Sequence, residues 1–267
     1  MNLPTVTLEP VKRTLSIGDE VGNIEPNIFD DCILVDPNGS QVGLFIKKLP
    51  PDLQNLVNIA DTEILTDRVP KTLMERSDTM RMVAMGRPRS EGTQQYSTIL
   101  GSIPPKPHMR RPYGSRSSVH ASKSARIFAK AMNAAGKKAF ELVEEYIPTV
   151  ADFHKAKTKE RVPPKWTFAD NFTSTISNCN ISAPVHQDHA NVKGAVNIII
   201  TKRRNSKGGN LHVPDYGATF DQTDNSMLVY PAWRNMHGVT PIIPTYQGGY
   251  RNSHVWYALD SFNSLRD

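Results

Sequence analysis

Cysteine is scarce in this chain of 267 residues, which holds only Cys32 and Cys179. Two cysteines cannot form a disulfide framework, and these two lack the spacing of metal ligands, so we expect reduced, packed thiols. Long apolar runs are also missing: the purest, AVNIII, is far shorter than the roughly 20 residues that cross a bilayer. The first ten residues lack the pattern of a secretory signal. These absences exclude a membrane bundle and favour a soluble intracellular protein.

Acidic residues are missing from two long stretches in which lysine and arginine continue. No aspartate or glutamate lies between Glu91 and Glu141, and none lies between Asp188 and Asp215. A single short basic cluster usually covers a solvated loop, but two long stretches of one sign, in a chain of net charge +6, favour a nucleic-acid partner. The residues expected to contact backbone phosphates are Arg110, Arg111, Arg116, Lys202, Arg203 and Arg204.

Local patterns predict several elements in the first part of the chain. Residues 31–50 predict a β-hairpin, because two apolar segments flank a Pro-Asn-Gly-Ser turn in which Asn38-Gly39 suits positive φ. Residues 51–65 predict a helix with Asp52 as a candidate N-cap. Residues 86–120 are rich in Gly, Pro, Ser and Arg and predict long loops.

A second helix is predicted over residues 124–148, where apolar residues recur at steps of three and four. Gly136 is a candidate break in this helix, and Pro148 is expected to end it. Its buried face is expected to contain Phe128, Met132, Ala135, Ala139, Leu142 and Tyr146.

Many short apolar segments separated by turn signals follow residue 165, a pattern typical of a β-sandwich or closed barrel. Because no linker separates two parts, we expect a single α+β domain over residues 1–267. Residues 1–164 are expected to supply the hairpin, basic loops and helices, and residues 165–267 the catalytic half.

Three side chains in the second half have the types and spacing of an iron site. Residues i and i+2 of a strand share a face, so His186 and Asp188 in APVHQDHANVKGAV can bind one metal. The third ligand has to come from a separate strand, and His237 in RNMHGVTPI is placed to supply it. Two imidazoles and a carboxylate on one face of an octahedron leave the opposite face open, as a non-haem Fe(II) centre requires. His189 and His212 are more readily structural or substrate-facing residues.

Arg251 and Ser253 favour the metal site over the alternative that His-x-Asp is an ordinary polar bend. They stand two residues apart in YRNSHVWY and therefore share a strand face. A guanidinium beside a hydroxyl forms a clamp for a carboxylate, and 2-oxoglutarate-dependent oxygenases hold the distal carboxylate of their co-substrate in this way. A surface arginine on an edge strand is the alternative.

With these motifs the chain resembles the TET/JBP branch of the Fe(II)/2-oxoglutarate-dependent dioxygenases. The likeness covers residues 183–260 and includes HQDHAN, GGNLHVPDYG, HGVTP and RNSHVWY. It implies a double-stranded β-helix, a jelly-roll or cupin-like core, with flanking helices. It also implies Fe(II), 2-oxoglutarate and O₂ as cofactor and co-substrates, and oxidation of the 5-methyl group of a pyrimidine in DNA.

The same resemblance assigns two residues to the substrate. Asn191 matches an asparagine that contacts the target base, and Tyr257 matches an aromatic residue that stacks on it. Alternation along the strand agrees, because Tyr257 shares the face of Arg251 and Ser253, although a core aromatic is the alternative. Leu259 is a departure, since relatives that read methylcytosine have a histidine there.

The resemblance therefore implies an enzyme that flips a methylated pyrimidine out of DNA and hydroxylates it, most readily 5-methylcytosine to 5-hydroxymethylcytosine. A thymine hydroxylase that yields 5-hydroxymethyluracil is an alternative, and so is a protein hydroxylase of the prolyl type, which would share the triad and the clamp. A non-enzymatic jelly-roll binding protein is disfavoured, because a decayed site usually loses a ligand. We expect a monomer with no membrane partner.

Overall fold

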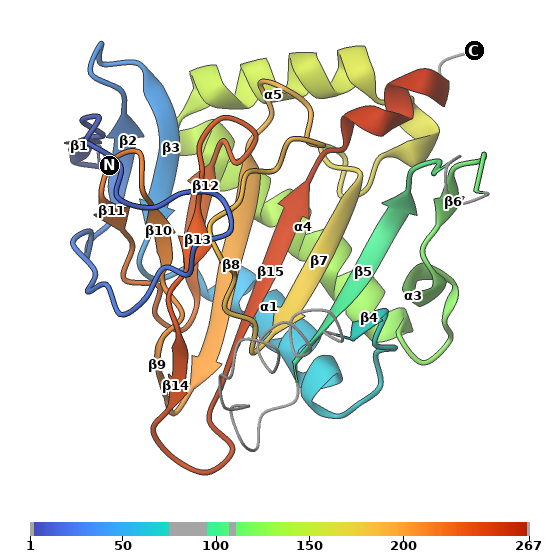
Figure 1. The fold of residues 1–267 in the computed structure, drawn as a ribbon. Coiled ribbons are helices and arrows are strands. Elements are labelled where there is room, and N and C mark those ends of the chain that lie inside the picture. Colours follow the sequence, from blue (N-terminus) through green and yellow to red (C-terminus); the bar gives the residue numbers. More distant parts are fainter. Residues whose placement is uncertain (1–2, 75–94, 107–110, 266–267) are drawn as a thin grey trace.

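The structure is a computed structural model that describes residues 3–74, 95–106 and 111–265, and its centre is one large sheet with helices on one face (Figure 1). Strands β1 and β2 are parallel, and the other neighbouring strands of the sheet are antiparallel. The order is β1 (Thr5–Thr7), β2 (Cys32–Val35), β3 (Gln41–Ile46), β12 (Ser226–Tyr230), β8 (Asn197–Arg204), β15 (Tyr250–Tyr257), β7 (Ser174–Cys179), β5 (Tyr96–Ile103) and β4 (Leu73–Met74), with β6 (Ser115–Arg116) paired to β5.

Two smaller sheets complete the β structure of the described residues. One has the order β11 (Ala218–Thr219), β10 (Leu211–Val213), β13 (Gly238–Val239), and the other pairs β14 (Ile242–Pro244) with β9 (Ser206–Gly208). Strands β10 and β11 share a hydrophobic core with β2, β3, β8 and β12. The large, mostly antiparallel sheet and the β11-β10-β13 sheet, called the small sheet below, thus pack face to face, as in a jelly roll. The expected α+β jelly roll with flanking helices is confirmed.

The opposite face of the large sheet is covered by helices α1 (Pro51–Leu65), α4 (Arg126–Tyr146) and α5 (Pro148–Arg161) (Figure 1). A short helix, α3 (Ser118–Ala121), contacts β5, and 3₁₀ turns span Pro164–Trp166 and Asp260–Leu265. Alternation along β8 separates the two cores: Ile198 and Ile200 pack with the helices, whereas Ile199 packs with the small sheet. The apolar run AVNIII therefore leads into β8, which begins at Asn197 and is buried on both faces here.

Gly136 does not break α4, contrary to the prediction. A Cβ atom at this position would lie 2.5 Å from Nε1 of Trp256, so the missing side chain lets the helix approach β15 closely. Nε1 of Trp256 donates a hydrogen bond to the backbone oxygen of Met132 at 3.1 Å. The glycine therefore marks a packing contact between helix and sheet.

The other local predictions have mixed outcomes. The hairpin is confirmed as β2 and β3, with Gly39 at a φ of 79°, and the helix of residues 51–65 is confirmed as α1. Asp52 is not an N-cap: α1 starts directly after Pro50, and Asp52 pairs with Lys138 instead. The loop prediction for residues 86–120 is wrong over β5, whose strand pairs with β7, and part of that range lies outside the described residues.

The large sheet draws strands from both parts of the chain, since β1 to β5 precede residue 165 and β7, β8, β12 and β15 follow it. Cys32 and Cys179 are both unpaired and buried, as expected. No helix in the described ranges combines the length and apolar character that a membrane span requires.

Candidate metal centre and its cavity

The three predicted metal ligands meet beside the β11-β10-β13 sheet, where His237 directly precedes β13. The backbones of His186 and His237 exchange two hydrogen bonds of 2.8 Å, and their ring centroids lie 4.3 Å apart. Asp188 follows on the same face, and its Oδ1 lies 3.7 Å from Nε2 of His186. One ligand atom from each residue lies within 4.8 Å of the other two. The structure thus brings together the set that the His-x-Asp spacing and the separate histidine predicted.

Both imidazoles are oriented through their second nitrogen. Nδ1 of His186 lies 2.8 Å from the backbone oxygen of Pro184, and Nδ1 of His237 lies 3.3 Å from that of Asn235. These contacts place the proton on Nδ1 and leave Nε2 as the ligand atom. Burial, with a smaller contribution from His186, lowers the pKa of His237, which keeps this ring in the neutral form that binds metals.

The carboxylate of Asp188 is held by two asparagines. Its Oδ2 accepts hydrogen bonds from Nδ2 of Asn197 at 3.0 Å and from Nδ2 of Asn191 at 3.4 Å. Nδ2 of Asn191 also donates to Oδ1 of Asn197 at 2.9 Å. Oδ2 is therefore occupied, and Oδ1 is the oxygen that faces the histidines. This donor set, two imidazoles that present Nε2 and one fixed carboxylate oxygen, fits Fe(II).

Arg251 is a buried cation that has no acidic partner among the described residues. It is 2% exposed on the inner face of β15, and in the described part of the chain its guanidinium contacts one neutral oxygen, Oε1 of Gln222, at 3.3 Å. Its Nε has no hydrogen-bond partner among those residues. Burial, followed by the nearby charge of Arg203, lowers the pKa of Arg251 to about 9. A buried charge is costly unless it is paired, so this guanidinium is suited to a ligand carboxylate.

One cavity of about 680 Å³ joins the metal-ligand cluster to Arg251. Its wall is banded because side chains align across neighbouring strands. Ser97, Asn178 and Ser253 form one polar row across β5, β7 and β15, and Ile176 and Val255 form the next row toward the cluster. The cavity therefore has a cationic, polar end and a metal-binding end with an apolar band between them.

All seven residues predicted for metal, co-substrate and substrate line this cavity: His186, Asp188, Asn191, His237, Arg251, Ser253 and Tyr257. Asn191 is 5% exposed, and its amide group holds Asp188 and Asn197, a structural task that the sequence did not indicate. Leu259 also lines the cavity, and its backbone bridges to that of Asn191. His189 lies at the cavity as well, whereas His212 is buried in β10 and contacts Thr219.

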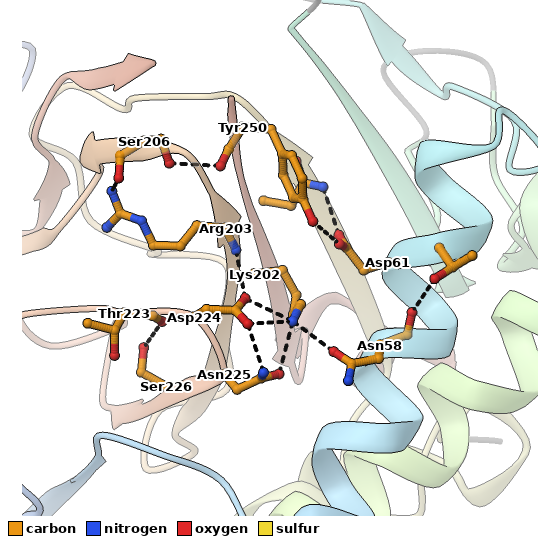
Figure 2. Close-up of polar contacts among 12 residues, drawn as sticks. Asn58, Asp61, Lys202, Arg203, Ser206, Thr223, Asp224, Asn225, Ser226 and Tyr250 are labelled. Atoms are coloured by element: carbon orange, nitrogen blue, oxygen red, sulfur yellow. Dashed lines mark hydrogen bonds and ion pairs between the residues drawn. The ribbon is translucent and has the colours of Figure 1, made fainter. Parts of the chain in front are cut away.

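Lys202 is buried in this fold, which disfavours the predicted phosphate contact. Its ammonium is buried against α1, where it donates to Asn58 at 2.7 Å and Asn225 at 3.1 Å and pairs with Asp224 at 2.8 Å (Figure 2). Strand alternation explains this burial, because Lys202 shares the helix-facing side of β8 with Ile200.

The remaining basic residues differ in whether their side chains donate hydrogen bonds within the fold. Arg203 donates to the backbone oxygens of Gly208 and Gln222 at 3.0 and 3.1 Å, and Arg116 donates to Ser102 at 2.7 Å, so both guanidinium groups serve the fold. Arg204 and Arg111 are exposed, and Arg116 is exposed as well although its guanidinium is hydrogen-bonded. Arg110 lies outside the described residues. The phosphate contacts predicted for Arg110, Arg111, Arg116, Arg203 and Arg204 stay predictions, and Arg204 and Arg111 are the stronger candidates among the described residues.

Two buried residues that the motifs did not reveal hold the site together. Asn197 positions Asp188, and its only sequence signal is that it is a polar residue inside the apolar strand AVNIIIT. Gln222 contacts Arg251, but it lies in the polar segment FDQTDNS, where nothing separates it from ordinary loop residues. Their contacts depend on long-range packing that spacing alone does not show.

No protein-family model and no curated protein matches the chain. Among solved structures it is similar to NgTET1 in complex with 5mC DNA, with 12% identity and a TM-score of 0.55 over 93% of this chain and 86% of that one. It is also similar to an oxidoreductase of the 2OG-Fe(II) oxygenase family from Burkholderia pseudomallei (11% identity, TM-score 0.41, 80% and 84% coverage). A third is a prolyl hydroxylase from Trichoplax adhaerens in complex with a hypoxia inducible factor oxygen degradation domain peptide fragment. Its identity is 9% and its TM-score 0.44, over 85% of this chain and 87% of that one. The likeness to NgTET1 shows that the two chains share the jelly-roll fold.

Proposed function

We propose that the chain is an Fe(II)- and 2-oxoglutarate-dependent dioxygenase. The main support is that one cavity holds both the oriented set His186, Asp188 and His237 and the uncompensated Arg251. A metal-binding set alone suits many reactions, and a buried arginine alone suits many anions. Together they suit a co-substrate that chelates a metal at one end and carries a carboxylate at the other, as 2-oxoglutarate does.

Each residue then has a defined task. His186, Asp188 and His237 would hold Fe(II), and the bound metal with 2-oxoglutarate and O₂ supplies the oxidation of a C–H bond. Arg251 binds the distal carboxylate with its planar fork, and Ser253 donates its hydroxyl from the same strand face. The two histidine Nδ1 contacts and the Asn197 amide keep the ligand atoms in place before any ligand arrives.

We propose a methylated pyrimidine in DNA as the substrate, with 5-methylcytosine as the favoured base. The methyl group lies in the major groove of a duplex, so the base has to be flipped into the cavity at a cost of a few kcal/mol. Stacking on Tyr257 would offset about 1–3 kcal/mol of that cost. The fold shared with NgTET1, a structure solved with 5mC DNA, supports this partner. Leu259 offers the base no hydrogen bond, which keeps thymine as the second candidate.

The remaining part of the proposal concerns the chain as a whole. Residues 1–267 act as one dioxygenase domain, and the exposed Arg111 and Arg204 contact DNA phosphates. Asn191 touches the flipped base while its amide holds Asp188.

The test offers the purified protein Fe(II), 2-oxoglutarate and matched duplexes that contain either 5-methylcytosine or thymine as the only methylated pyrimidine, or a proline-containing peptide. Succinate and the modified nucleosides are measured by mass spectrometry, with Asp188→Ala as the inactive control. We expect succinate and 5-hydroxymethylcytosine together. 5-Hydroxymethyluracil as the sole product would make thymine the substrate base. Hydroxylation of the peptide alone would support a protein hydroxylase. If the protein neither binds metal nor forms any product, a non-enzymatic binding protein would be supported.

A further inference from the structure

Gln222 is the one described side chain that accepts a hydrogen bond from the guanidinium of Arg251, and the chain holds it firmly. It lies between β11 and β12 and is fully buried. Its Oε1 accepts hydrogen bonds from the backbone N–H of Leu211 at 2.9 Å and from Nη2 of Arg251 at 3.3 Å. Its backbone N–H donates to Oδ1 of Asn210 at 3.2 Å, and its backbone oxygen accepts from Arg203. The amide oxygen is therefore fixed toward Arg251.

The stem of Arg251 is confined as well. A Cβ atom at Gly209 would lie 3.1 Å from Cδ of Arg251 and 3.0 Å from Ile242, and the φ of +66° disfavours any residue other than glycine. The glycine thus allows the backbone to pack directly against the arginine stem. With its stem packed and one N–H directed to Gln222, the guanidinium has little freedom to leave the cavity.

A glutamine and a glutamate have the same shape at this position but opposite consequences for the charge. A carboxylate would pair with Arg251 and satisfy it inside the protein. The neutral amide oxygen of Gln222 orients the guanidinium and leaves its charge to be balanced by something else. Two buried donors in this region, Nε of Arg251 and Nε2 of Gln222, have no hydrogen-bond partner among the described residues.

We propose that Gln222 is a positioning residue that keeps Arg251 oriented but uncompensated, so that affinity for a dicarboxylate is gained at the expense of stability in the ligand-free protein. Gln222 does not line the cavity, and it acts through Arg251. The inference rests on the proposed function, in which Arg251 binds the distal carboxylate of 2-oxoglutarate. It adds the residue that adjusts this affinity.

The decisive variant is Gln222→Glu, compared with wild type as Mn(II)-loaded protein under exclusion of oxygen. Titration calorimetry with 2-oxoglutarate gives the affinity, and thermal unfolding without ligand gives the Tm. Because the introduced carboxylate would pair with Arg251, we expect the Kd to rise about tenfold or more while the Tm rises by about 2–4 °C. Opposite changes in affinity and stability are the signature, since damage to the fold lowers both.

Two further variants separate the possible failures. Asn58→Asp adds the same charge beside Lys202, a cation that is already paired, and we expect it to leave the Kd unchanged. Arg251→Met removes the guanidinium and should abolish measurable binding. If Arg251→Met binds 2-oxoglutarate like wild type, the proposed function fails at the clamp. If Arg251→Met loses binding but Gln222→Glu keeps its Kd, or lowers both Tm and affinity, the inference about Gln222 is overturned and the proposed function stands.

Discussion

Two buried cations lie on neighbouring strands and on opposite faces of the large sheet. Lys202 of β8 faces α1, where Asn58 and Asn225 accept its hydrogen bonds and Asp224 supplies a negative charge (Figure 2). Arg251 of β15 faces the cavity, where the described residues offer its guanidinium a single neutral oxygen. Their exposed fractions are similar, 6% and 2%. The difference is that the described residues supply an anion for Lys202 and none for Arg251.

This difference distinguishes a structural cation from a ligand-binding one better than burial does. A paired buried cation has its desolvation cost offset within the fold, so nothing further has to bind. An unpaired one keeps that cost until an anion arrives, so ligand binding and stability become linked. Lys202 is thus part of the framework, and Arg251 is part of the site.

The largest expected effect is at the metal-ligand cluster, where the situation is reversed because the protein supplies the anion and the ligand is the cation. Asp188→Ala should abolish Fe(II)-dependent turnover of 2-oxoglutarate and leave the fold intact, because a single ligand is lost from an otherwise preformed site. Succinate formation, Fe(II) titration and circular dichroism measure the three properties. Turnover like that of wild type would mean that the triad is assigned wrongly.

The next effect concerns the geometry of the unpaired cation. Arg251→Lys keeps a positive charge but loses the planar fork, so we expect the KM for 2-oxoglutarate to rise well over tenfold. Lys202→Arg is the matched control, because it makes the opposite exchange on the helix-facing side of the sheet and should leave this KM unchanged. An unchanged KM in Arg251→Lys would move the clamp to another residue, with Arg234 as the next candidate.

A third effect tests stability instead of binding. Lys202→Met removes the hydrogen bonds that Asp224, Asn58 and Asn225 accept from the ammonium, and we expect a loss of about 1–2 kcal/mol in the free energy of unfolding, since Asp224 is partly hydrated. Arg251→Met removes a charge that has no partner, so its loss should be smaller or even a gain. Urea denaturation of both variants without ligand measures the difference. A larger loss at Arg251 would contradict the distinction between the two cations.

The sequence predicted the parts of the site that depend on local geometry. Strand alternation places His186 with Asp188 and Arg251 with Ser253, and these pairs do line one cavity. The same alternation, applied to β8, predicts that Lys202 faces the helices. The phosphate contacts were predicted only from the run of basic residues, without regard to which face of the strand each side chain occupies. The compensation of charge could not be predicted, because Asp224 and Gln222 reach their partners through the fold of the β11–β12 connection.

The fold was predictable to a similar extent. The apolar strand of β8 and the helix period of α4 follow from hydrophobic pattern, whereas β5 stands among Gly-, Pro- and Ser-rich residues and becomes a strand because β7 offers it a partner. Gly136 was expected to break α4 because its intrinsic helix propensity is low. Its packing against Trp256 outweighs that preference, which only the tertiary structure reveals.

The smallest expected effect concerns cations at the surface. From the sequence, neutralising Arg203 and Arg204 together should make the salt dependence of DNA binding shallower by about two units of log–log slope, one for each phosphate contact. In the structure Arg203 donates to Gly208 and Gln222, and Arg204 is exposed over the ring of Tyr250, with its guanidinium carbon 5.7 Å from the ring centroid. We therefore expect the double variant Arg203→Gln, Arg204→Gln to change the slope by about one unit, and Arg204→Gln alone to account for it. Binding of a fluorescent duplex at a series of salt concentrations measures both slopes. A change of two units would show that Arg203 leaves its internal partners for DNA, and no change would remove this end of β8 from the DNA-binding surface.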